Sequence, residues 1–148
     1  MTGLELAARC RARGAAIRRL KESLSDARER MTGTTAPLDK MPSGSGGDRF
    51  AAHAARVDDL TRRVKAEQKR QRDDKKALAV LCADMEERPR AVILLFYGEG
   101  LSASRVAGET GQAQRTVYHH LAQGRSILRQ AEGAERLLPK GAREEEEA

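Results

Sequence analysis

The chain has 148 residues, a length that fits one domain or two small ones. Charged residues make up 34% of it and aromatic residues only 3%, which argues against a large globular core and favours long, partly exposed helices. The formal net charge of +6 favours an anionic partner, with nucleic acid as the first candidate. An arginine-rich, solvated helical surface would have the same composition.

Neither cysteine nor any apolar segment indicates a metal site or a membrane anchor. Cys10 and Cys82 are far apart and have no second cysteine or histidine at metal-ligand spacing, so we expect two buried, reduced thiols, no metal and no cofactor. No apolar run is long enough to cross a membrane, and the N-terminus lacks the apolar core of a signal peptide. We therefore expect a cytoplasmic protein without a membrane partner.

The first part of the chain, residues 1–87, has the pattern of a helical hairpin. Apolar residues recur at steps of three and four over residues 4–31, interrupted only by Arg13, and predict a helix with a heptad seam. Residues 32–47 are rich in Pro, Gly, Ser and Thr and predict a mobile loop. Apolar residues spaced in sevens predict a second helix over about residues 48–87. Together they predict a long antiparallel, coiled-coil-like hairpin.

The middle of the second predicted helix is polar on every side. Residues 65–76 lack a seam, so this stretch is either exposed or bridges two packed ends. Residues 62–76 contain eight basic and three acidic residues, which makes them a second candidate surface for DNA. A solvated helix face is the simpler explanation of that charge.

Residues 88–131 have the pattern of a three-helix, helix-turn-helix domain. Pro89 suits the first turn of a helix, where its missing N–H needs no partner. Ser102 is placed as the N-cap of a second helix, and Gly111 falls where the chain must turn into a third. Apolar residues of the third helix, including Ile127, recur at helical spacing. The predicted trihelical core comprises Val92, Leu95, Phe96, Val106, Ala107, Val117, Leu121 and Leu128.

The third helix of this domain has the charge expected of a helix that enters a DNA groove. No Asp or Glu occurs over residues 110–131, and carboxylates there would be repelled by DNA phosphates. Residues at the N-terminal end of a recognition helix reach base edges, and Arg suits guanine as Gln suits adenine. Ser102 and Arg105 are better placed for phosphates, and Arg125 for the backbone or for no contact. The predicted DNA-binding residues are Ser102, Arg105, Gln114, Arg115, Thr116, Tyr118, His119 and Arg125.

The segment RPRAVILLFYGEGLSASRVAGETGQAQRTVYHHLAQGRSILRQ resembles region four of bacterial sigma factors. The family pattern is matched by Gly100, Leu101, Ser102, Val106, Ala107, Gly111, Thr116, Val117 and Leu128. Two residues depart from it: Gln112 stands where the family has an apolar anchor, and Gly124 stands where it has alanine. Both departures are expected to weaken packing. For Gly124 the expected cost is about 1 kcal/mol, because glycine is less favourable than alanine in a helix.

Over residues 4–130 the chain also resembles small phage late-gene regulators of the ArpU and RinA type. That resemblance implies activation of phage late genes, with double-stranded DNA and host RNA polymerase as partners. The predicted protein is thus an all-α DNA-binding transcription regulator, and its hairpin is an arm for self-association or for polymerase contact. Residues 132–148 are expected to be a disordered acidic tail.

Two other functions fit the same pattern. One is a phage DNA-packaging recognition subunit of the small-terminase kind, in which the hairpin builds a ring. The other is a sigma-like module that binds protein surfaces without reading DNA. The sequence shows no catalytic set of residues and no phosphate-binding loop, so we do not expect an enzyme.

Overall fold

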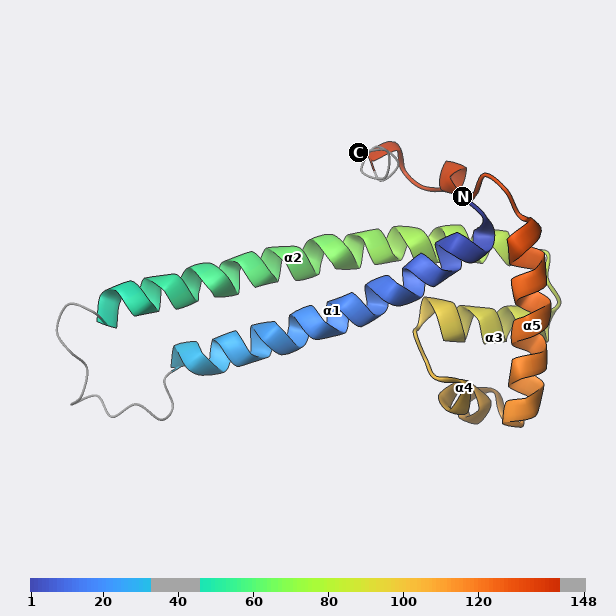
Figure 1. The fold of residues 1–148 in the computed structure, drawn as a ribbon, viewed down its shortest axis with the longest axis horizontal. Helices are drawn as coiled ribbons and strands as arrows, with labels where there is room; N and C mark the ends of the chain where they lie inside the picture. The colour runs from blue at the N-terminus through green and yellow to red at the C-terminus, as the bar shows by residue number, and fades with distance from the viewer. Residues whose placement is uncertain (33–45, 142–148) are drawn as a thin grey trace. The chain divides into compact units, whose positions relative to one another are not determined.

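The fold is all-α over the part of the chain that the structure, a computed structural model, describes: residues 1–32 and 46–141 (Figure 1). No helix in those two ranges is both long and apolar enough to cross a bilayer. The elements follow in the order α1 (Gly3–Thr32), α2 (Gly46–Leu81), α3 (Glu87–Ile93), the π-helical turn η2 (Leu94–Gly98), α4 (Ala103–Thr110), α5 (Gln114–Gln130) and the 3-10 turn η3 (Ala134–Leu137). Residues 33–45 of the predicted loop and residues 142–148 of the predicted tail lie outside the described residues, while Thr32, Gly46 and Gly47 belong to helix ends.

The chain divides into two compact units, and residues 16–68 form one of them. In this unit α1 and α2 pack against each other through a small apolar cluster. Leu24 and Ala27 of α1 lie against Leu60 and Val64 of α2, with Leu20 and Val57 at the edge of the cluster. Figure 1 shows the two helices running in opposite directions, so the pair is antiparallel, as predicted for the hairpin.

The other unit consists of residues 1–15 and 69–148, and it joins the start of α1 and the end of α2 to the C-terminal helices. Leu6 of α1 packs in one buried cluster with Ala77 of α2. A Cβ added to Gly14 would lie 2.9 Å from the Gln71 amide nitrogen. These compact units do not follow the division at residue 87 that the sequence suggested. That 88–131 acts as a domain of its own stays a prediction.

A buried carboxylate explains the interruption of the heptad seam on α1. Asp74 lies in the polar middle of α2, yet it is only 1% exposed. Arg9 approaches its Oδ1 at 2.7 Å and Arg13 approaches its Oδ2 at 3.2 Å. A buried charge needs such partners, since an uncompensated ion in the interior is costly. Arg13 therefore takes a seam position because it faces Asp74 and not an apolar side chain.

The second helix ends earlier than predicted. It stops at Leu81 and a turn over residues 82–85 follows, so the expected continuation to residue 87 is wrong. The turn contains no Gly or Pro. Cys82 and Met85 in this turn are both buried in the main core, and Met85 keeps the seven-residue spacing from Leu78, which is why the sequence reads as unbroken helix. The next helix, α3, has Pro89 in its first turn, as predicted.

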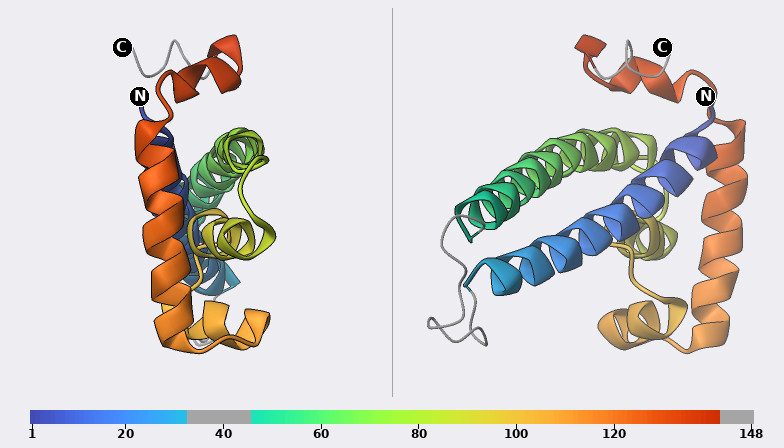
Figure 2. Two further views of the ribbon diagram at one scale, coloured as in Figure 1. Left: turned by 90° about the vertical axis from the view of Figure 1, so that its right-hand side faces the viewer. Right: turned by 60° about the vertical axis from the view of Figure 1, so that its left-hand side comes forward.

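The C-terminal helices α3, α4 and α5 surround one apolar core (Figure 2). Val92, Val106, Val117, Leu121 and Leu128 are fully buried, and Leu95, Phe96 and Ala107 pack against them half-buried, so the predicted trihelical core is confirmed. Ile127 is an exception, because 47% of it is exposed. The prediction that Ile127 lies on the apolar face of α5 is wrong, and the next residue, Leu128, lies there instead.

Part of the predicted disordered tail is folded. Glu132 forms an isolated antiparallel bridge with Thr2, and the N–H of Gly3 donates to the carbonyl of Ala131 at 2.8 Å. The turn η3 follows, and Leu138 is 2% exposed in the cluster that holds Leu6. The expectation of disorder from residue 132 is therefore wrong for residues 132–141. Figure 2 shows this segment turning back toward the N-terminus from the end of α5.

Candidate nucleic-acid interface

The helices α4 and α5 and the turn between them form a helix-turn-helix. Ser102 is the N-cap of α4, since its hydroxyl accepts the N–H of Arg105 at 3.2 Å. Gly111 ends α4 in the left-handed conformation, with φ of 68°, which glycine adopts without the steric cost of a Cβ. Both expectations about the ends of this helix are confirmed. The turn therefore has a fixed geometry and sets where α5 begins.

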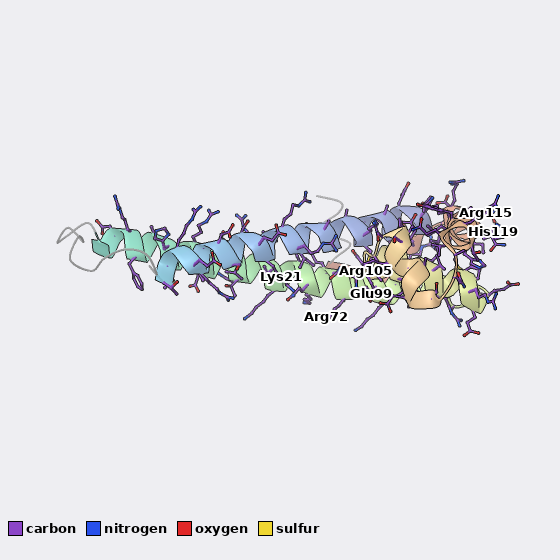
Figure 3. The ribbon with its side chains drawn as sticks, turned by 90° about the horizontal axis from the view of Figure 1, so that it is seen from below. Lys21, Arg72, Glu99, Arg105, Arg115 and His119 are labelled. Atoms are coloured by element: carbon purple, nitrogen blue, oxygen red, sulfur yellow. The ribbon has the colours of Figure 1, made fainter. Side chains whose placement is uncertain are left out.

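Opposite sides of α5 are apolar and polar. Val117, Leu121, Gly124 and Leu128 are buried against the rest of the domain. Val117 and Leu121 thereby fix the rotation of the N-terminal half of the helix about its axis. The exposed side of that half is formed by Gln114, Arg115, Tyr118, His119 and Ala122, and Figure 3 labels Arg115 and His119 on it.

Four of the eight predicted DNA-binding residues thus share one exposed face of α5, which we call the reading face: Gln114, Arg115, Tyr118 and His119. Tyr118 is 57% exposed, so packing within the protein does not explain an aromatic side chain at this position. Thr116 is half-buried at the edge of this face, next to the core residue Val117. Arg105 and Ser102 are exposed on and before the first turn of α4, separate from the reading face.

The charge of the reading face suits an anionic ligand. Helix α5 has no carboxylate along its length, while it has three arginines and two histidines. Its N-cap residue is Ala113, which has no side-chain group to bond the N–H groups of the first turn. Those groups and the helix dipole favour negative charge at this end. The helix itself is thus donor-rich and has no carboxylate, while Asp84 and Glu86, which precede α3, line a pocket beside His119.

Arg125 lies apart from the reading face and contacts the protein itself. Its Nε donates to the hydroxyl of Tyr97 at 2.7 Å, and its guanidinium carbon is 5.7 Å from the centre of the Phe96 ring. The side chain is half-buried. In this structure Arg125 ties α5 to η2, and its contact with DNA stays a prediction.

Arg11 supports the same region, and sequence reasoning did not find it. Its Nη1 donates to the carbonyl groups of Phe96 at 2.5 Å and Leu101 at 3.0 Å. Its guanidinium carbon lies 3.9 Å from the centre of the Phe96 ring, within range of a cation–π contact. Together, the two hydrogen bonds hold η2 and the start of the segment that leads to α4 in place. The sequence holds one indirect signal: a helix that ends near Gly98 and Gly100 leaves carbonyl groups without a partner in the helix, and these groups need a donor from elsewhere.

Gly124 is a close-packing residue, which corrects the expectation that it weakens the fold. A Cβ at this position would lie 2.5 Å from Cδ1 of Ile93 and closer still to its Cγ1. Ile93 on α3 is fully buried. The glycine therefore lets α5 approach α3 closely, and the isoleucine fills the space that an alanine methyl group would take. The two residues compensate for each other.

Gln112 fits the expectation of a weak point. Its side chain is half-buried in the turn, and its amide oxygen is buried with no hydrogen-bond partner among residues 1–32 and 46–141. A buried polar atom without a partner costs about 1–3 kcal/mol. An apolar side chain at this position would carry no such penalty.

The two histidines of α5 do not form a metal site. The ring centres of His119 and His120 are 5.7 Å apart, and Nδ1 of His120 lies 3.2 Å from the Gln123 amide oxygen. Within the described ranges, no group of three side chains could ligate a metal ion.

Both cysteines are buried, and desolvation raises the pKa of Cys10 and of Cys82 to about 11. A raised thiol pKa disfavours the nucleophilic thiolate.

The fold and the exposed face of α5 define a helix-turn-helix module. Residues 76–128 match the sequence model of the family described as Sigma-70, region 4, whose members are non-enzymatic DNA-binding domains. The match begins in the last turns of α2 and ends on α5, so it includes all of α3 and α4. No curated protein and no solved structure matches the chain. The chain thus contains a sigma region four-like DNA-binding module.

Proposed function

We propose that this protein is a sequence-specific transcription regulator that inserts the start of α5 into the major groove of double-stranded DNA. The observation that carries the proposal is the reading face, which is exposed and donor-rich on a helix without carboxylates, within the segment that matches sigma region four. Arg115 would pair with guanine and Gln114 with adenine. Tyr118 and His119 would contact neighbouring base edges, and Thr116 would contact the edge of the groove.

Backbone contacts complete the proposed interface. Arg105, exposed on the first turn of α4, would bind a phosphate beside the groove, and the nearby Ser102 would add its hydroxyl. Arg125 would reach a phosphate only by leaving its hydrogen bond to Tyr97. These contacts would set the register of the module on the duplex, while the reading face would select the sequence.

The proposal extends to the setting in which the regulator works. The likeness to sigma region four supports RNA polymerase as a second partner, and the resemblance to ArpU- and RinA-type proteins supports a phage activator of late genes in the bacterial cytoplasm. The hairpin unit, residues 16–68, would serve as the arm for self-association or for polymerase contact. Its apolar cluster is small, and Phe50 is 56% exposed on α2. A partner that covers such side chains would add stability that the unit lacks by itself.

The proposed reading face can be tested with Arg115→Ala and a matched control, Arg129→Ala. Both arginines are exposed on α5, at opposite ends of the helix. Duplexes selected from a random pool give the target sequence and the footprint. Arg115→Ala should weaken binding to the selected site by about 1–3 kcal/mol and relax specificity at one base pair. Arg129→Ala should bind the site with the native preference at every base pair.

The stability of the same variants and the mass of the native protein discriminate the alternatives. An exposed arginine changes the free energy of unfolding by less than about 0.5 kcal/mol, so a large loss in Arg115→Ala would make that residue structural. Absence of salt-sensitive binding to any duplex would refute DNA binding and favour a protein-interaction module. A ring of many chains in solution would favour the DNA-packaging function, whereas a monomer or dimer would favour regulation.

A further inference from the structure

We propose that an exposed basic face of α2 binds the phosphate backbone of duplex DNA next to the site held by α5. The basic face comprises Lys69, Arg72 and Lys76, which are all exposed. The inference rests on the proposed DNA binding and adds a second, sequence-independent contact to it. Arg62 and Lys65, also exposed, continue the same spacing earlier on the helix.

The basic face lies directly opposite the packing seam of α2. Val64, Gln71 and Leu78 mark one seam position of the heptad, and Leu60 and Asp74 mark the other. Lys69, Arg72 and Lys76 follow one another at steps of three and four, midway between those seam positions. Residues at such steps line one side of a helix. Figure 3 shows Arg72 on the edge of α2 that faces away from α1.

One acidic residue of this part of α2 adjoins the basic face, since Asp73 lies four positions after Lys69 and three before Lys76. Asp74 is buried in its ion pairs with Arg9 and Arg13. Glu67 and Asp73 are half-buried. A solvated helix face normally mixes both signs of charge, because alternating charges stabilise the helix. The three exposed residues of the basic face outnumber the half-buried Asp73 beside them, so the face keeps a net positive charge that favours an anion.

A neighbouring lysine shows the contrast. Lys75 is one position away from the basic face, and its Nζ lies 3.3 Å from Oε1 of Glu99. The charge of Lys75 is therefore paired with a carboxylate of the protein. No such ion pair is seen for Lys69, Arg72 or Lys76 among the described side chains.

Duplex DNA is the anion that fits this face best. The basic face belongs to the same compact unit as α5, which presents the reading face. Its first and last charges are seven positions apart, or about 10 Å along the helix. Measured along the DNA axis, that length corresponds to about three phosphate steps on one strand, at about 3.4 Å each. A row of this kind would hold flanking DNA without reading its sequence.

The salt dependence of DNA binding tests the inference. The triple variant Lys69→Gln, Arg72→Gln and Lys76→Gln is compared with a control, Arg18→Gln, Arg19→Gln and Lys21→Gln, which removes the same charge from exposed positions of α1. Affinity for a long duplex carrying the selected site is measured between 50 and 200 mM salt, as is binding to phosphatidylserine-containing vesicles. Each phosphate contact contributes about 0.9 to the slope of log affinity against log salt.

The triple variant should lower that slope by about 2 to 3, while the control keeps the native slope. The native protein should then lose about 40-fold more affinity over this range of salt than the triple variant does, with an unchanged preferred sequence. A native slope in the triple variant, with sequence preference intact, would overturn the basic-face contact but leave the reading face in place. Loss of vesicle binding alone would assign the face to a membrane surface. If the native chain binds no duplex, both proposals fail.

Discussion

Replacing Gly124 by alanine should destabilise the protein, although the same change usually stabilises a helix. In an exposed helix interior, alanine is favoured over glycine by about 1 kcal/mol. At this position the new Cβ would lie 2.5 Å from Cδ1 of Ile93, whereas carbon atoms in ordinary contact are about 3.5–4.0 Å apart. Relieving this overlap inside a packed core costs about 1–3 kcal/mol. We therefore expect a net loss of about 1 kcal/mol.

A double-mutant cycle separates the two contributions. Ile93→Ala by itself should cost about 2–5 kcal/mol, because it leaves a cavity in the core. In that background the obstacle to a Cβ at Gly124 is gone, so Gly124→Ala should become stabilising by up to about 1 kcal/mol. Gly108 provides the control: it is exposed on α4 with nothing within 4 Å of an added Cβ, so Gly108→Ala should stabilise the native protein.

The free energy of unfolding in urea, followed by the helical circular dichroism, measures each corner of the cycle. If Ile93→Ala is too unstable to analyse, Ile93→Val removes Cδ1 alone and should relieve part of the overlap. The reasoning is refuted if Gly124→Ala stabilises the native protein as much as it stabilises the Ile93 variants. That outcome would mean that α5 and α3 are not held in the close contact that the structure shows.

Three further changes test contacts around the module. Arg11→Met removes two charged hydrogen bonds and a cation–π contact, so it should lower the free energy of unfolding by about 2–3 kcal/mol in urea titrations; an unchanged midpoint would contradict those contacts. Gln112→Leu should raise the melting temperature, since it replaces a buried amide oxygen without a described partner. Cys10 and Cys82 should resist iodoacetamide at pH 8 in the folded protein and react in urea, because a pKa raised from 9.0 to about 11 lowers the thiolate fraction about 100-fold. Rapid labelling of the folded chain would show that these thiols are accessible.

The parts of this fold that the sequence predicted well depend on contacts between near neighbours. The N-cap at Ser102 joins residues three positions apart, and the turn at Gly111 needs only the conformation of that glycine. The apolar positions of α5 repeat every three or four residues. Such signals are local, so the helix-turn-helix and most of its core could be predicted from the chain alone.

The features that sequence reasoning missed depend on residues far apart in the chain. Arg11 and Phe96 are 85 residues apart, and nothing near either one indicates the other. The end of α2 was missed for a related reason: Cys82 and Met85 stay buried through the turn, so the apolar spacing does not change. Gly124 appeared to be a defect because its compensating residue, Ile93, belongs to another helix.

The division of the chain into two compact units determines how this protein can be truncated or redesigned. The compact unit that contains α5 is assembled from residues 1–15 and 69–148, so the hairpin residues 16–68 are an insertion within it. A fragment limited to the matched segment, 76–128, would lose Arg11 and also Leu6 and Leu138, which pack together in the second buried cluster. The hairpin can instead be shortened by removing whole heptads in pairs from both of its helices, which preserves their register. Arm length is thereby separable from the module that meets DNA.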